Sequence, residues 1–226
     1  MIRAAAYSEP HPLPDTHPAL LAERAQDKPK GERTRAQIMI AACHVLDRTA
    51  PQDVTIGAIC KQAGIAHGTF YIYFPDRDAL LADLLLGFVA HLQGRMLSAS
   101  HGEPHDRIRA ATRAYAAMFE QNKGLMRCLV HHLDAFPNAR AAFHRLNRDW
   151  LETVVSATQR RLANEGRSAA ITEEELWRRA HALGGMVDHY LSSLFLSGEP
   201  GIVAVSDKIE AVIETLSLIW ERGLEP

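Results

Sequence analysis

Hydrophobic residues recur at helical spacing along most of this 226-residue chain. The first clear case lies between Gly31 and Thr49, where the apolar positions are Ile38, Ala41, Ala42, Val45 and Leu46. Residues spaced three to four apart share one side of an α-helix. No segment alternates between apolar and polar residues over a useful length, so we expect no strands. The pattern predicts an all-α fold.

Further helices are predicted along the rest of the chain. A long one starts at Pro75, carries a leucine-rich face, and is expected to end at a loop over Ser98–Pro104. Proline and glycine residues then separate the remaining segments. The helices expected after the loop lie near Asp106–Gln121, Gly124–Ala135, Asn138–Glu165, Thr172–Ser197 and Val203–Arg222.

The stretch from Thr55 to Leu80 predicts two short helices joined by a tight turn. Thr55 suits an N-cap, and Gly64 can take the positive φ that ends one helix and redirects the chain. In the next helix, about Ala66 to Phe74, inward packing of Phe70 and Phe74 would turn the polar and aromatic residues outward. The outward set is His67, Gly68, Thr69, Tyr71 and Tyr73. A helix-turn-helix places such a second helix in the DNA major groove.

The run AGIAHGTFYIYF at residues 63–74, with Pro75, Asp76, Arg77 and Leu80 after it, resembles the DNA-binding signature of TetR-family transcriptional regulators. The resemblance extends back through Thr55 and Ile59 and covers roughly residues 30–85. Three positions depart from the pattern. Ala66 stands where the family often has serine, His67 where it often has lysine or arginine, and Arg77 where it usually has lysine. The remaining two thirds of the chain matches the family in length and helical pattern.

The resemblance implies a three-helix helix-turn-helix domain over residues 30–78, followed by a larger helical effector-binding and dimerisation domain over residues 79–226. Two helix starts carry cations that oppose the helix dipole, which suggests phosphate partners. We expect base contacts from His67 and Gly68, and the resemblance implies phosphate contacts from other members of the set. The residues expected at DNA are Arg33, Arg35, Thr55, Lys61, Ala66, His67, Gly68, Thr69, Tyr71, Tyr73 and Arg77.

Residues 1–29 contain five of the eleven prolines and no periodic apolar stripe. This composition predicts a flexible N-terminal arm. Because the arm holds few basic residues, we expect an inert tail rather than a segment that follows DNA.

The last two predicted helices differ from the others. Thr172 and Glu175 have the spacing of a capping box, and two mid-helix glycines would let another backbone approach closely. The final helix carries a broad apolar stripe. The resemblance implies that these helices form a four-helix interface in a homodimer, and burial inside one subunit is the alternative. The expected interface residues are Gly184, Gly185, Ile209, Val212, Ile213, Leu216, Ile219 and Trp220.

No GxSxG, HExxH or phosphate-cradling glycine loop occurs in the sequence, so we expect neither an enzyme nor a cofactor. Aromatic residues and methionines beside a few polar groups are typical of an apolar small-molecule pocket. The residues expected to line it are Met118, Phe119, Met126, His132, Phe136, Phe143, Trp150, Met186, His189 and Tyr190.

Composition adds further limits. The three cysteines form no CxxC pair and lie in apolar contexts, which favours buried thiols in a cytoplasmic protein. Gly102 and Pro104 argue against a helix that would align His101 and His105 as metal ligands, so no metal is expected. No run of about 18 apolar residues occurs, so no membrane span is expected. The formal net charge is −2, and charge alone would not indicate DNA binding.

These patterns together predict a ligand-responsive DNA-binding transcriptional regulator that acts as a homodimer. Its partners would be double-stranded operator DNA and a small hydrophobic effector. We expect a repressor that an apolar or aromatic molecule releases from a palindromic operator. The alternative is a helical dimeric binding or scaffold protein without DNA affinity. The outward face of Ala66–Tyr73 favours the regulator, because a scaffold has no need to expose such residues.

Overall fold

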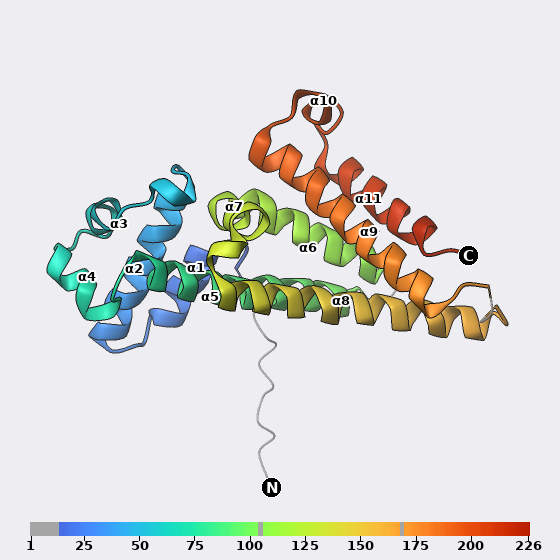
Figure 1. The fold of residues 1–226 in the computed structure, drawn as a ribbon, viewed down its shortest axis with the longest axis horizontal. Coiled ribbons are helices and arrows are strands. Elements are labelled where there is room, and N and C mark those ends of the chain that lie inside the picture. The colour runs from blue at the N-terminus through green and yellow to red at the C-terminus, as the bar shows by residue number, and fades with distance from the viewer. Residues whose placement is uncertain (1–13, 104–105, 168–169) are drawn as a thin grey trace, which may run out of the picture.

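The computed structural model describes residues 14–103, 106–167 and 170–226, and the regular secondary structure in these ranges is entirely helical (Figure 1). The N-terminal head contains α1 (His17–Ala25), α2 (Lys30–Leu46), α3 (Ile56–Ala63) and α4 (His67–Tyr73). A 3-10 turn, η1 (Pro51–Asp53), joins α2 to α3. The predicted all-α fold is confirmed.

The helix-turn-helix forms as its sequence predicts. The Thr55 hydroxyl accepts a hydrogen bond from the Ala58 N–H and caps α3. Gly64 ends α3 with φ +66°, the left-handed conformation that glycine adopts without a steric penalty. Phe70 and Phe74 are both buried beneath α4. Their burial fixes α4 against the head and leaves its opposite face to solvent.

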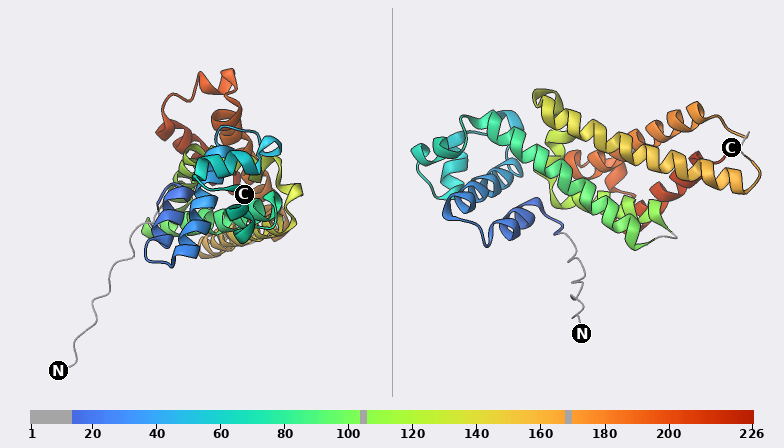
Figure 2. Two further views of the ribbon diagram at one scale, coloured as in Figure 1. Left: turned by 90° about the vertical axis from the view of Figure 1, so that its left-hand side faces the viewer. Right: turned by 90° about the horizontal axis from the view of Figure 1, so that it is seen from below.

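The long helix α5 (Arg77–Gly102) connects the head to the C-terminal body (Figures 1 and 2). Asp76 caps it by accepting a hydrogen bond from the Ala79 N–H, so the helix begins two residues after Pro75. It continues through Gly102, so the loop predicted over Ser98–Pro104 is wrong for residues 98–102. Serine, alanine and histidine tolerate a helix, and the glycine falls at its last residue, where it does not interrupt it.

α5 is also the one helix in the described ranges long and apolar enough to cross a membrane. Half of its most apolar stretch is buried inside the protein, where the helix packs against α2, α6, α7 and α8. These contacts account for its apolar composition as that of a central core helix.

The C-terminal body consists of α6 (Arg107–Gln121), α7 (Lys123–His131), α8 (Pro137–Asn164), α9 (Glu173–Ser192), α10 (Pro200–Val203) and α11 (Ile209–Gly223). A short 3-10 turn, η2 (Leu133–Ala135), follows α7, and one π-helical turn, η3 (Ser193–Ser197), extends α9. The predicted segments coincide with these helices, except that the last one divides into α10 and α11. One contiguous cluster of buried hydrophobic residues extends from the head into the body.

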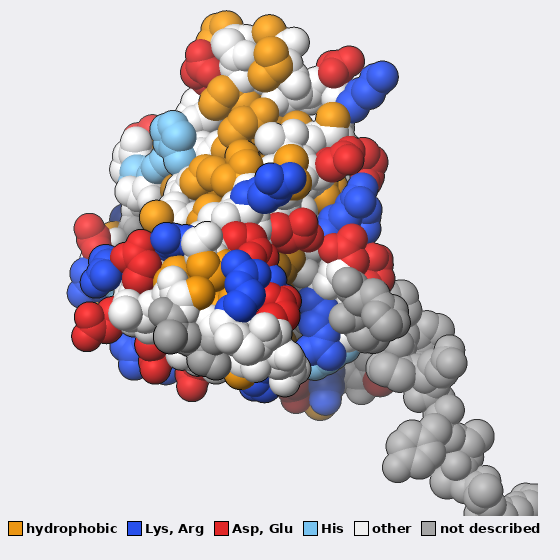
Figure 3. Space-filling view, turned by 90° about the vertical axis from the view of Figure 1, so that its right-hand side faces the viewer, with side chains coloured by type: hydrophobic (Ala, Val, Ile, Leu, Met, Phe, Trp, Pro, Cys, Tyr) orange, Lys and Arg blue, Asp and Glu red, His pale blue; other side chains and the backbone are white. Residues whose placement is uncertain are grey.

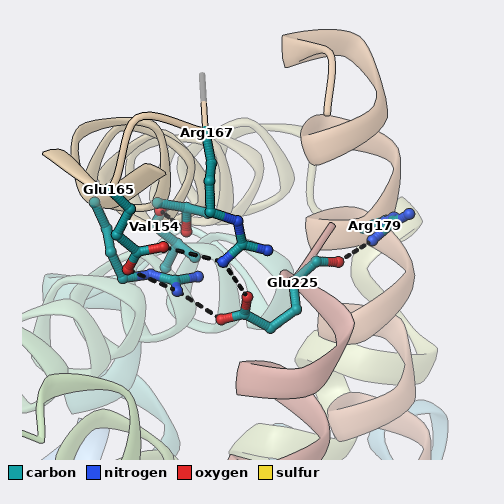
Figure 4. Close-up of polar contacts among 7 residues, drawn as sticks. Val154, Glu165, Arg167, Arg179 and Glu225 are labelled. Atoms are coloured by element: carbon teal, nitrogen blue, oxygen red, sulfur yellow. Dashed lines mark hydrogen bonds and ion pairs between the residues drawn. The ribbon is translucent and has the colours of Figure 1, made fainter. Parts of the chain in front are cut away.

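Charged side chains fasten the C-terminal end of the chain to the body (Figure 4). The Glu225 carboxylate lies 2.6 Å from an Arg161 guanidinium nitrogen on α8, and 3.6 Å from that of Arg167. The Arg179 guanidinium on α9 donates a 2.6 Å hydrogen bond to the Glu225 carbonyl. These contacts hold the end of α11 between α8 and α9.

The predicted flexible arm is wrong for residues 14–29, while residues 1–13 lie outside the described part of the chain. Thr16 caps α1, His17 and Leu20 are buried, and the helix packs along α2. Pro18 is compatible with this helix because it lies in the first turn, where no backbone N–H donor is needed.

A buried polar cluster holds the start of α1 against α5 and α6. The His17 N–H donates to Asn122 Oδ1 at 2.7 Å, and Asn122 Nδ2 donates to the Asp15 carbonyl at 2.9 Å. His91 Nε2 lies 2.7 Å from the Pro14 carbonyl, which can only accept, so this nitrogen carries the proton. In neutral His91 the other nitrogen then accepts from His17 Nδ1, 3.3 Å away.

This arrangement leaves His17 Nε2 unprotonated and without a hydrogen-bond partner in the described structure. Burial, followed by the neighbouring His91 and Arg24, lowers the pKa of His17 from 6.5 to about 3. A proton on Nε2 would introduce a buried charge that no acceptor stabilises.

A second junction joins α7 to the end of α2. A Cβ atom on Gly124 would lie 2.5 Å from the Leu46 carbonyl carbon and 2.7 Å from the Asp47 nitrogen. The Gly124 N–H donates to Asp47 Oδ1 at 3.1 Å. Only glycine permits this approach, which brings the body into direct backbone contact with the head.

We expect acid to destabilise the protein through His17. A histidine with a lowered pKa in the folded state contributes stability above its unfolded pKa of about 6.5, and this contribution is lost as pH falls below that value. Urea unfolding at pH 5.0 should show a loss of about 2 kcal/mol relative to pH 7.5 from this residue. The His17→Phe variant keeps an aromatic ring beside Phe88 and should lose correspondingly less. An equal decline in both proteins would contradict the assignment.

We also expect Gly124→Ala to destabilise the folded protein by about 1–3 kcal/mol, since the new methyl group would meet the α2 backbone. The matched control is Gly185→Ala on α9, where no atom lies within 4 Å of the added Cβ. That change should stabilise the helix by about 0.5–1 kcal/mol. Chemical denaturation measures both values, and similar effects of the two substitutions would show that the α2–α7 approach is not tight.

Candidate DNA interface and ligand cavity

The outer face of α4 combines aromatic, apolar and small residues at the tip of the head. His67 and Gly68, at the start of the helix, are exposed, and Tyr71 is 55% exposed. Ile72 is 75% exposed, which is unusual for an isoleucine on a helix. The sequence analysis did not select Ile72, although its position midway between the two inward phenylalanines indicates an outward direction.

The predicted DNA residues near the start of α3 are already engaged with the protein. Thr55 uses its hydroxyl as the α3 cap. The His67 ring folds back over Gly57, with Nε2 3.4 Å from the position that a Cβ on Gly57 would occupy. Ala66 is exposed as the N-cap residue of α4 and provides no side-chain hydrogen bond. Gly57 is therefore part of this surface, because a larger side chain would press against His67.

Thr69 and Tyr73 are half-buried and lie toward the side of α4. The Tyr73 hydroxyl is 3.9 Å from the Cβ position of Gly31, in the first turn of α2. No side chain caps the N-terminus of α2. The first N–H groups of a helix have no partner within the helix, so those of α2 can donate to an external acceptor. Tyr73 and the start of α2 thus present hydrogen-bond donors next to each other.

The four basic residues predicted to contact DNA differ in their surroundings. Arg33 and Lys61 are exposed and form no ion pair with the described acidic residues. Arg35 lies 2.6 Å from the Asp83 carboxylate and 4.8 Å from the centre of the Phe74 ring. Arg77 pairs with Asp78 and donates to the carbonyls of residues 52 and 54, each at 3.2 Å. Arg35 and Arg77 therefore stabilise the head itself.

A cavity of about 260 Å³ lies in the body among α5, α6, α8, α9 and α11. Its walls are mostly apolar, with polar side chains concentrated on α9 and α6. The lining residues are Met96, Ile108, Ala111, Thr112, Tyr115, Asn147, Trp150, Leu151, Val154, His181, Gly184, Gly185, Val187, Asp188 and Trp220. A second hollow, of about 350 Å³, shares Asn147 and Asp188 with it.

Of the ten residues predicted to line a pocket, Trp150 lies in the wall of this cavity and Phe143 in that of the second hollow. The others do not line the first cavity, and that part of the prediction is corrected. Met118, Phe119, Met126 and Phe136 are buried in the hydrophobic core, where other side chains enclose them. The remaining residues lie on partly or fully exposed surfaces and are His132, Met186, His189 and Tyr190.

The cavity wall contains a half-buried acidic residue that the sequence analysis did not identify. Tyr115 on α6 donates a 2.7 Å hydrogen bond to Asp188 Oδ1 on α9. Burial raises the pKa of Asp188 from 3.8 to about 6, and the Tyr115 hydrogen bond partly offsets this rise. Burial, followed by the Asp188 charge, also raises the pKa of Tyr115 well above 10. In the described structure Asp188 has no ion-pair partner.

The residues predicted for a dimer interface fall into three groups. Val212, Ile213, Leu216 and Trp220 are buried inside the subunit, where α11 packs on α6 and α9. For these four, the alternative of burial within one subunit is correct. Gly184 and Gly185 border the cavity, and Ile209 is half-buried.

Ile219 remains 39% exposed on α11, and Leu218, Val203 and Val205 are exposed nearby in the sequence. Figure 3 views this end of the molecule and shows hydrophobic side chains gathered on its upper part, with charged side chains around them. An apolar surface of this kind remains available for a partner.

No group of three or more potential metal-ligating side chains occurs within the described ranges. His101 is exposed in the last turn of α5, and His105 lies outside the described residues.

Comparisons with known proteins place the chain among transcriptional regulators. The family model "Bacterial regulatory proteins, tetR family" matches residues 38–84, which include the helix-turn-helix. The HTH-type transcriptional regulator EthR of Mycolicibacterium smegmatis is 24% identical over 204 residues, which cover 89% of this chain and 90% of EthR.

Two solved structures share the fold. A TetR-family regulator from Bordetella parapertussis has a TM-score of 0.62 and 20% identity, and the match covers 82% of this chain and 93% of that chain. The regulator FadR from Bacillus subtilis, solved in complex with stearoyl-CoA, has a TM-score of 0.62 and 14% identity. That match covers 84% of this chain and 98% of FadR. The helix-turn-helix sequence and the family model together show that residues 38–84 form a DNA-binding domain of the TetR family, and the chain as a whole shares its fold with solved TetR-family regulators.

Proposed function

We propose that this regulator binds a palindromic operator as a homodimer and represses transcription until a small, largely apolar molecule enters the cavity. The proposed DNA binding rests chiefly on the outer face of α4. Two buried phenylalanines hold this helix rigidly, while His67, Gly68, Tyr71 and Ile72 face solvent. A scaffold protein without DNA affinity would not account for this combination.

The start of α4 is the part of a recognition helix that meets base edges. His67 can donate or accept a hydrogen bond there, and Gly68 permits close approach of the backbone. Ile72 offers an apolar surface for a thymine methyl group. These contacts would specify the operator sequence.

Phosphate contacts would come from the edges of the same surface. Tyr73, the uncapped start of α2 and Arg33 lie at one edge and offer donors and a positive charge. A helix N-terminus favours an anion through its unpaired N–H groups and dipole. Lys61, Tyr71 and Thr69 would contact the backbone elsewhere. Arg35 and Arg77 would act indirectly, by holding α2, η1 and α5 in place.

The homodimer would use the outer face of α11 and the adjacent part of α9. Ile219 and Leu218 lie on the side of α11 opposite its buried stripe, so pairing would cover residues that the subunit leaves exposed. A two-fold axis would then present two α4 helices to two operator half-sites.

The cavity would receive the effector. Met96 of α5 lies in its wall, and Arg77 of the same helix lies in the head. A ligand that prefers one position of α5 would therefore move the head and change the spacing of the two α4 helices. FadR from Bacillus subtilis, which shares this fold, was solved in complex with stearoyl-CoA, and this supports a small-molecule ligand for the present chain. Coupling of about 1–3 kcal/mol would weaken operator binding roughly 5–150-fold.

The DNA assignment predicts different outcomes for two substitutions in the head. Arg33→Ala should weaken binding to all sequences about equally and reduce the slope of affinity against salt by about 1, because one phosphate contact is lost. His67→Ala should change the preferred base at one or two positions of each half-site. Selection from a randomised operator library, combined with binding titrations at several salt concentrations, measures both effects.

The control is Arg160→Ala, which removes an exposed arginine on α8, outside the head. Its operator affinity should equal that of the unmodified protein. The assignment fails if His67→Ala leaves the sequence ranking unchanged and Arg33→Ala leaves the salt dependence unchanged in a correctly folded dimer.

A further inference from the structure

The cavity combines mostly apolar walls with a single half-buried carboxylate, that of Asp188, which lacks a cationic partner in the described structure. Asp188 lines both this cavity and the second hollow, so it lies where the two spaces meet. Tyr115 donates to Oδ1 and leaves the other oxygen of the carboxylate without a protein donor among the described contacts. A carboxylate among apolar walls loses part of its hydration, so a ligand that donates to the unpaired oxygen would stabilise it.

The basic side chains that line the two spaces form no ion pair with Asp188. Arg140 lines the second hollow, but it forms a 3.0 Å ion pair with Asp134. His181 lines the cavity from α9, two helical turns before Asp188 on the chain. The Asp188 carboxylate is therefore the one acidic side chain in the wall of the first cavity, and its lone pairs are free to receive a donor.

We propose that the effector of this regulator is an apolar molecule with a protonated amine, and that Asp188 selects it by pairing with the ammonium group. This inference rests on the proposed function, because it specifies the ligand of the same cavity. The apolar walls formed by Ile108, Leu151 and Val187 would hold the tail. The indole rings of Trp150 and Trp220 are also in the wall and can stabilise a cation through their π faces.

The same geometry disfavours an anionic head group. A ligand carboxylate at this position would face the Asp188 charge at close range in a partly buried site, where like charges repel more strongly than in bulk water. A neutral alcohol would donate one hydrogen bond to Asp188 but would not neutralise it. Affinity should therefore follow the order amine, alcohol, carboxylate for tails of equal length.

The test uses octylamine, octanol and octanoate, which share one tail and differ in charge. Binding to the full-length protein at pH 7.5 is measured by calorimetry and by tryptophan fluorescence, since two of the three tryptophans line the cavity. Octylamine should bind about tenfold more tightly than octanol, because a charge-assisted hydrogen bond replaces a neutral one. Octanoate should bind most weakly.

The variant is Asp188→Asn, which keeps the size of the side chain and an acceptor for Tyr115. It should reduce octylamine affinity to that of octanol and leave octanol affinity within about twofold. The matched control, Asp207→Asn, removes an exposed carboxylate that lines neither space and should retain the amine preference.

Operator release measured with the same three probes separates this inference from the proposed function. If octanol binds and releases the operator as well as octylamine does, the amine preference is wrong and the ligand-responsive regulator stands. Retention of the preference in Asp188→Asn would also overturn the role of Asp188. If none of the probes binds, both the amine inference and the proposed effector cavity are contradicted.

Discussion

The continuity of α5 is the constraint on which the rest of this structure depends. Its first residues belong to the head, where Leu80, Leu81 and Leu84 are buried, and its later residues belong to the body, where Met96 borders the cavity. Met96 lies nineteen positions after Arg77 in this α-helix, an axial distance of about 28 Å. Because no loop interrupts this segment, a displacement at the cavity reaches the head as a displacement of the whole helix.

Two further junctions limit how the head can respond. Gly124 brings the start of α7 into contact with the end of α2, and the cluster around His17, His91 and Asn122 fixes α1 against α5 and α6. The head is thus attached to the body at three places. We infer that it moves as a unit rather than by local loosening, since the core is continuous across these junctions.

Local patterns predicted the helices well and the sites less well. Thr55, Gly64, Phe70 and Phe74 have roles set by their immediate neighbours, so the helix-turn-helix could be derived from spacing and capping preferences. The helix α1 could not, because its proline-rich sequence has little apolar periodicity and its stability comes from contacts with distant residues such as Asn122.

The partners of the charged residues could not be predicted from local sequence either, because they lie far away along the chain. Arg35 pairs with Asp83, 48 positions away, and Tyr115 meets Asp188 across 73 positions. The cavity wall likewise combines five helices, and periodicity alone does not indicate which face of each helix points inward. Trp150 borders the cavity, while Met118 and Phe119 were equally suitable by type but are enclosed by the core.

The most direct test of the coupling account is the distance between the two α4 helices of the dimer, measured by pulsed electron spin resonance. Ile72→Cys provides an exposed labelling site, and the three native cysteines are buried. Occupation of the cavity, verified by tryptophan fluorescence with octylamine or octanol, should shift the distance by about 2 Å or more. An unchanged distance in a dimer with a filled cavity would contradict the account.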